Sequence, residues 1–105
     1  MIIYEVNLDV DAAIASEYRA WLSEHIAHML DLPGFTGAQM YEVTDPAPAS
    51  DRVIFSVHYQ MRDQAALDTY MRDHAARMRA DGIARFGERQ RTSRRVLHAG
   101  AAFAR

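Results

Sequence analysis

The sequence has 105 residues, of which 50% are hydrophobic, and this suits one domain with a substantial core. It contains no cysteine, so a disulfide framework and a thiolate metal site are both excluded. No apolar run approaches the roughly 20 residues of a membrane span, and the first residues do not resemble a signal peptide. We therefore expect a cytoplasmic protein that does not bind membranes.

Charge is divided unevenly along the chain. Residues 1–51 hold nine acidic residues and one arginine, whereas residues 52–105 hold eleven arginines and five acidic residues. The arginines are spread over predicted helices and strands and do not form a basic tail. We interpret the asymmetry as attraction between two halves of a fold or of a dimer.

Alternating apolar and polar residues predict a first strand at 2–10, with Tyr4 on its buried face. The stretch IYEVNL at 3–8 is similar to the RNP2 strand of RNA-recognition motifs, in which the aromatic residue projects outward. Here the alternation points Tyr4 inward. In the strand predicted at 52–61, Ile54 and Ser56 occupy the base-stacking positions. We therefore expect no nucleic-acid binding.

A helical period follows from Ala12 to Leu30, and His25 lies at the centre of its apolar stripe. Strands are predicted at 35–44 and 52–61, with a loop at 45–51 between them. A second helix is predicted from Asp63 to about Ala80, with His74 near the centre of its stripe. A turn with a short helical piece then leads into a last strand at 88–98.

This order, β-α-β-β-α-β, predicts an α+β ferredoxin-like plait, a four-stranded antiparallel sheet with two helices on one face. The domain is expected at 1–98, followed by a tail at 99–105. The uncovered sheet face would carry Ile3, Met40 and Ile54 beside Glu5 and His58. This mixture is too apolar for water and too polar for a dry core, so we expect a homodimer formed through the open sheet face.

Two stretches resemble a known superfamily. Trp21, with the EHI run at 24–26 and LPGFTGAQMY at 32–41, is similar to the dimeric α/β-barrel superfamily, which includes antibiotic-biosynthesis-type monooxygenases. DHAARMRADGIARFGERQ at 73–90, with the N-terminal MIIYEVNLDVD, resembles more closely one small bacterial family of unknown function within it. The resemblance implies a ligand site between helices and sheet in each subunit.

The haem-degrading branch of this superfamily uses an asparagine on the first strand, a tryptophan near the end of the third strand and a histidine on the second helix. Asn7 and His74 match the first and third by element, but Met61 lies where the tryptophan is needed. Asn7 also points away from the helices by alternation. Haem is therefore a weak alternative, and we expect no cofactor.

The apolar stripes of the two helices should converge on one space, which predicts a small-molecule pocket. We expect His25 and His74 to act there as proton-transfer groups, within an aromatic lining. The expected ligand-binding residues are Tyr4, Trp21, Phe55, Tyr59 and Tyr70. The open alternative is that each histidine is a packed core residue with a buried hydrogen bond.

His25 and His28 are spaced like one edge of a metal site, but no third ligand is evident, so we expect no metal. The arginines at 85, 89, 91, 94 and 95 would either clamp an anionic ligand or form a solvated edge strand. The function predicted on the superfamily resemblance is cofactor-independent monooxygenase or isomerase chemistry on an aromatic or polyketide-like substrate. A non-catalytic ligand-binding or regulatory module remains the alternative.

Overall fold

The computed structural model describes residues 1–105. It contains four strands, three α-helices and two short 3₁₀ segments. The strands are β1 (Ile2–Asp11), β2 (Phe35–Glu42), β3 (Arg52–Met61) and β4 (Gln90–His98). The helices are α1 (Ala15–Leu30), α2 (Gln64–Asp73) and α3 (Ala75–Phe86). Residues 99–105 form no helix or strand.

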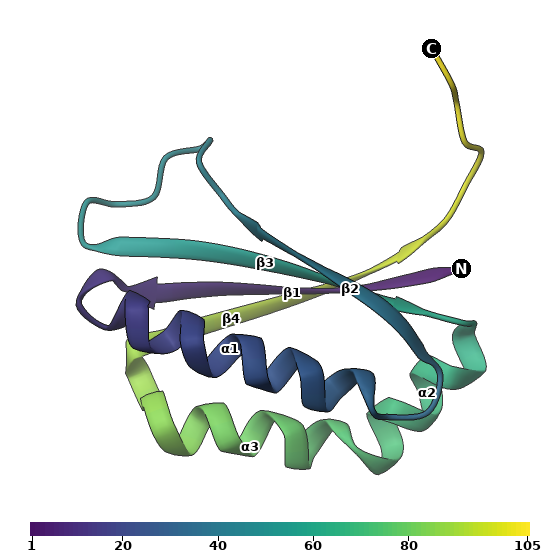
Figure 1. Ribbon diagram of the computed structural model, residues 1–105, viewed down its shortest axis with the longest axis horizontal. Coiled ribbons are helices and arrows are strands. Elements are labelled where there is room, and N and C mark those ends of the chain that lie inside the picture. The colour runs from purple at the N-terminus through teal and green to yellow at the C-terminus, as the bar shows by residue number, and fades with distance from the viewer.

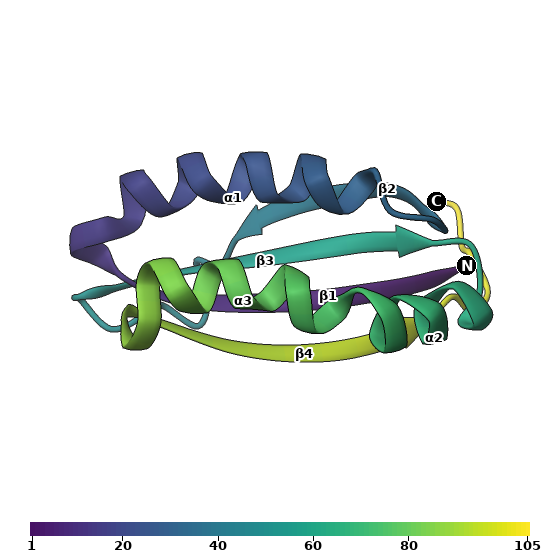
Figure 2. The ribbon, with the colours of Figure 1, turned by 90° about the horizontal axis from the view of Figure 1, so that it is seen from below.

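The four strands form one antiparallel sheet in the order β2-β3-β1-β4. All three helices lie on one side of it (Figure 1). Seen from the helical side, α1 runs over the β2–β3 half, and α2 and α3 run over the β1–β4 half (Figure 2). This is the predicted ferredoxin-like plait with one sheet face left uncovered. No helix is long and apolar enough to cross a bilayer.

The side chains of β1 alternate between the two faces of the sheet, as the sequence predicted. Tyr4 and Val10 are buried beneath the helices, whereas Glu5 and Asn7 lie on the open face.

An aspartate caps the helix that follows β3. The carboxylate of Asp63 accepts a hydrogen bond from the backbone N–H of Ala66 at 2.9 Å, which fixes the start of α2.

The placement of Met40 on the open face was wrong. A β-bulge between Phe35 and Gly37 inserts an extra residue into β2 and reverses the side-chain parity downstream. Met40 therefore pairs with Val57 on the helical face and packs against the core. Tyr41 takes its place on the open face, where its ring lies 5.1 Å from that of His58.

The second helical region also differs from the prediction. Instead of one helix ending near Ala80, the chain forms α2, breaks at His74, and continues as α3 to Phe86. His74 has φ −131° and ψ −29°, so the helix axis changes direction there. The predicted turn with a short helical piece at 81–89 is mostly helix, because Gly82 and Phe86 continue the buried face that begins with Ala75 and Met78.

The uneven charge distribution is used within a single chain. Arginines from the second half contact acidic residues from the first half at three places. Arg52 pairs with Asp9 at 2.7 Å across β1 and β3, and Arg95 pairs with Glu5 across β1 and β4. The third pair joins residues 85 and 17. These pairs favour the observed docking of the two halves.

Candidate functional site

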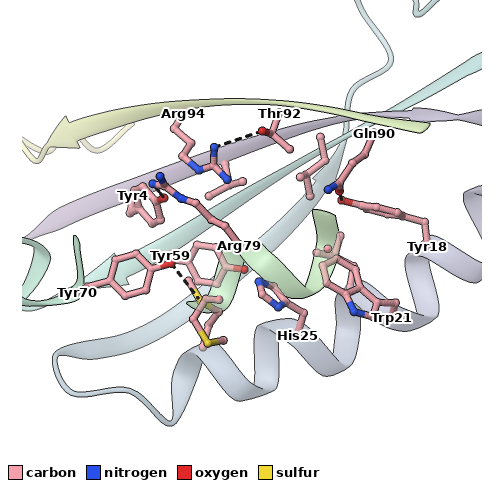
Figure 3. A pocket seen from close by; sticks show the side chains of 16 residues that line it. Tyr4, Tyr18, Trp21, His25, Tyr59, Tyr70, Arg79, Gln90, Thr92 and Arg94 are labelled. Carbon is pink, nitrogen blue, oxygen red and sulfur yellow. Dashed lines mark hydrogen bonds between the residues drawn. The ribbon is translucent and has the colours of Figure 1, made fainter. Parts of the chain in front are cut away.

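A pocket lies between the helices and the covered sheet face (Figure 3). The lining comes from the strands β1, β3 and β4 and from all three helices. The lining residues are Tyr4, Val6, Leu8, Tyr18, Trp21, Leu22, His25, Met29, Tyr59, Tyr70, Met78, Arg79, Gly82, Gln90, Thr92 and Arg94. The space open to the centre of a water molecule is about 40 Å³, enough for a few waters. An aromatic ligand therefore requires movement of a lining side chain.

Five of the seven site residues expected from the sequence line this pocket. They are Tyr4, Trp21, His25, Tyr59 and Tyr70. Phe55 does not line it, because its ring is fully buried and stacked parallel to that of Tyr18 at 6.3 Å. It supports the pocket wall from behind, and Tyr18 lines the pocket in its place.

His74 does not meet His25 in this pocket. The helix break at His74 turns its imidazole outward, where Nδ1 lies 2.9 Å from a guanidinium nitrogen of Arg77. A continuous helix would have kept the residue on the stripe of Leu67, and apolar periodicity alone does not reveal a break. A catalytic role of His74 remains a prediction without support from this geometry.

His25 lies at the mouth of the pocket. Its ring stacks on Trp21, with ring centres 4.7 Å apart and planes 19° apart. The same imidazole also lines an outer groove between α1 and α3, together with Asp81 and Arg77. Burial lowers the pKa of His25 below its usual 6.5, although the Asp81 carboxylate partly opposes this. The imidazole is therefore neutral at pH 7 and able to accept a proton.

The tryptophan that supports His25 is itself fixed. Trp21 Nε1 donates a hydrogen bond to the Asp81 carboxylate at 2.8 Å. Gly82 makes this approach possible, since a Cβ atom there would lie 3.0 Å from the indole ring. The absence of a side chain at Gly82 thus lets α3 pack close to α1.

Tyrosines form the inner wall. The rings of Tyr59 and Tyr70 tilt against Tyr4, with ring centres 6.1 and 5.5 Å from it. Burial raises the pKa of both Tyr59 and Tyr70 above its ordinary value, so both phenols stay protonated. Tyr18 is held by Gln90, whose side-chain oxygen accepts a hydrogen bond from the phenol at 2.6 Å.

The polar groups at the β4 side of the pocket were not identified as a site from the sequence. Arg79 on α3 donates a hydrogen bond to the Tyr4 hydroxyl at 3.0 Å, and Arg94 on β4 donates to Thr92 at 3.3 Å. Arg94 pairs with Val6 of β1 and so shares the face of Tyr4. Antiparallel alternation from Gln90 onward is the signal that would have found Arg94, whereas no sequence signal singles out Arg79.

A separate polar cluster lies on the open sheet face. Glu5 is buried there and contacts Arg95, His58 and Asn7 at 3.0 Å or less. The hydrogen bond from Arg95 lowers the pKa of Glu5 to about 2, against the opposing effect of burial. Asn7 also accepts a hydrogen bond from Ser56. Neither Asn7 nor His74, the two candidates for a haem site, lines the pocket.

Comparison with known proteins gives the family directly. The model of a family described as a domain of unknown function, DUF4286, matches residues 1–99. The chain belongs to the DUF4286 family. No curated protein matches the sequence of this DUF4286 protein.

Solved structures share the fold of this DUF4286 protein at low sequence identity. A candidate antibiotic biosynthesis monooxygenase from Deinococcus radiodurans is 16% identical, with a TM-score of 0.69 over 99% of this chain and 97% of that one. SnoaB, a cofactor-independent oxygenase from Streptomyces nogalater, is 12% identical, with a TM-score of 0.69 over 99% and 98%. A dimeric ferredoxin-like protein of unknown function from Jannaschia sp. CCS1 is 22% identical, with a TM-score of 0.58 over 94% and 100%. These likenesses establish the ferredoxin-like α+β fold.

Proposed function

We propose that this DUF4286 protein binds a planar aromatic or polyketide-like molecule in the pocket between α1, α3 and the sheet, and oxygenates it without a cofactor. The observation that carries the proposal is a neutral imidazole without a protein hydrogen bond at the mouth of an aromatic-lined pocket. The shared fold with a cofactor-independent oxygenase supports the same chemistry by analogy.

The chemistry requires a substrate that supplies its own electrons. Neutral His25 is suited to remove a proton from a phenol or from a CH₂ group activated by neighbouring rings. The carbanion or phenolate formed in this way transfers electrons to O₂ directly. One oxygen atom enters the product as a carbonyl and the other leaves as water, so no external reductant is needed.

The tyrosines of the inner wall would contact the part of the substrate that lies away from His25. Tyr59 lines the pocket without a protein hydrogen bond, and its raised pKa keeps it protonated at neutral pH. Its O–H is therefore available as a donor to an oxygen that gains negative charge during the reaction. The rings of Tyr59 and Tyr70 provide surfaces for an aromatic ligand.

One observation favours the second candidate, a non-catalytic binding module. His25 is the only titratable proton acceptor in the lining, which contains no carboxylate and does not include His74. A ligand that is bound and not oxidised fits this simple set of groups. The same pocket serves both functions, so turnover distinguishes them.

Oxygen uptake with 1,8-dihydroxyanthrone tests the proposal. This tricyclic compound has one activated CH₂ group, and reaction with one O₂ gives the anthraquinone and one water. We expect catalysed O₂ uptake with anthraquinone formation, falling roughly 100-fold or more in His25→Phe, as for loss of a general base. His28→Phe, an exposed change on the same helix, is the control. Saturable binding with O₂ uptake no faster than without protein would support the binding module instead.

A further inference from the structure

Two arginines face the pocket without an acidic partner. Arg79 and Arg94 both belong to the lining, and neither forms an ion pair, although seven other such pairs exist in the structure. The lining contains no aspartate or glutamate. The pocket therefore carries two positive charges that nothing in its wall neutralises.

The hydrogen bonds of these guanidinium groups are also incomplete. The Nε atoms of Arg79 and Arg94 are buried and have no hydrogen-bond partner. Their Nη atoms donate only to neutral groups. Arg79 donates to the Tyr4 hydroxyl and to the sulfur of Met71, and Arg94 donates to Thr92 Oγ1. A buried charged donor without a partner is costly, and such groups are rare in native proteins.

The arginines have no evident structural use that would explain the cost. Cation–π contacts in the structure involve Arg19 and Arg85, and neither Arg79 nor Arg94 lies over an aromatic ring in this way. Arg94 could have turned toward solvent, as an edge-strand arginine usually does. Its place on the Tyr4 face instead directs it under the helices.

The arrangement also gives a direction to a bound molecule. Arg79 comes from α3 and Arg94 from β4, and both approach the Tyr4 side of the pocket (Figure 3). His25 lies nearer to Trp21. A ligand with an anionic group at the Tyr4 side would therefore extend its ring system toward His25.

We propose that the ligand of this pocket is an aromatic carboxylate whose carboxylate group is bound between Arg79 and Arg94. The inference rests on the proposed function in taking the pocket as the ligand site, and it specifies the chemical class of the ligand. A carboxylate supplies both the missing charge and acceptors for the Nε atoms, in the bidentate geometry that guanidinium groups favour. Arg79, a long and half-buried side chain, is the group best able to move as the ligand enters.

Calorimetric titration of the unaltered protein tests this without any substitution. The probes are benzoate and 1-naphthoate, each compared with its carboxamide, which has nearly the same shape and no charge. We expect each carboxylate to bind at least about tenfold more tightly than its carboxamide, with the difference shrinking as salt is raised. Equal affinity for carboxylate and carboxamide, or no binding of either, would overturn the proposal.

Substitutions then identify the residues responsible. Arg79→Met and Arg94→Met keep much of the side-chain length and remove the guanidinium group, so the preference for carboxylate should fall to about twofold or less. Arg72→Met is the matched control, because Arg72 is exposed and pairs only with its neighbour Asp73. A preference that survives in both pocket variants would assign the carboxylate to another site and contradict the inference.

The two proposals fail in distinguishable ways. Carboxylate-selective binding without O₂ uptake by any tested compound would leave the ligand class intact and remove the oxygenase function. Catalysed uptake with 1,8-dihydroxyanthrone, together with equal binding of carboxylates and carboxamides, would do the reverse.

Discussion

At the scale of single residues, the half-buried imidazole of His25 links stability to pH. Its folded-state pKa is lowered by burial, whereas an unfolded chain gives histidine a pKa near 6.5. Below that pH the unfolded state binds a proton that the folded state resists, so His25 destabilises the fold as the pH falls from 6.5 through the folded pKa. Above pH 6.5 this effect is absent.

His25→Leu should therefore preserve or raise the free energy of unfolding at pH 8 and raise it further at pH 5. The pH-dependent gain is about 1.4 kcal/mol for each unit by which the pKa is lowered. Binding of aromatic probes or turnover should fall in the same variant. Denaturant unfolding at both pH values measures this, with His98→Leu, an exposed change on β4, as the control. A loss of about 1–3 kcal/mol at pH 8 would instead identify a packed histidine with a buried hydrogen bond.

Residue positions that depend on simple periodicity could be predicted from the sequence. The inward direction of Tyr4 follows from strand alternation, and the place of Trp21 and His25 on the covered side of α1 follows from helical spacing. Arg79 could not be found in this way, because whether a long side chain bends inward depends on the room left by neighbouring elements. That room is determined by the packing of α3 on β1 and β4.

At the scale of elements, the turn before β2 depends on one glycine. Gly34 has φ +86°, and a Cβ atom there would lie 2.4 Å from the Cβ of Ala66 at the start of α2. Both the backbone conformation and the close contact therefore exclude a larger residue. This contact brings the end of α1 and the start of α2 together.

Gly34→Ala should lower the free energy of unfolding by about 2–4 kcal/mol, as the sum of backbone strain and steric overlap. Gly87→Ala is the matched comparison. Gly87 also has a positive φ, 52°, but a Cβ atom there would meet nothing within 4 Å, so only the strain remains. Equal losses in the two variants, measured by chemical denaturation, would show that the contact with Ala66 contributes nothing.

Two element-level features could not be predicted because both are local departures from a regular period. The bulge at the start of β2 adds one residue and moves Met40 to the helical face. The break at His74 separates α2 from α3 and removes that histidine from the pocket. No proline or glycine, the residues that usually mark such a change, lies at the break at His74. Gly37 does lie at the bulge, but a glycine alone does not show that a residue is inserted there.

At the scale of the whole molecule, the uncovered sheet face is the expected interface between two copies of the chain. Ile3, Ile54 and Leu97 are half-buried there around the polar cluster of Glu5 and His58. We expect two copies to pack through this face, because pairing it would bury these apolar side chains.

Light scattering at micromolar concentration should then report about twice the 11.9 kDa of one chain. Ile54→Arg should shift the protein toward monomer, because the dimer would bury an additional charge. Arginine suits the test because Asp9 lies opposite residue 54 in β1, so the single chain tolerates the change. Ile83→Arg, on an exposed position of α3, should leave the mass unchanged. A monomer in the unaltered protein would contradict the expected interface.

The most direct test of the pocket as the functional site is NMR of the methionine methyl groups during titration with 1-naphthoate. The sequence has six methionines, of which Met29 and Met78 line the pocket. We predict saturable chemical-shift changes at Met29 and Met78, with the other methionines far less affected, apart from Met71, which contacts Arg79. Shifts confined to Met1, Met40 and Met61, or no shifts at saturating ligand, would contradict a ligand site between the helices and the sheet.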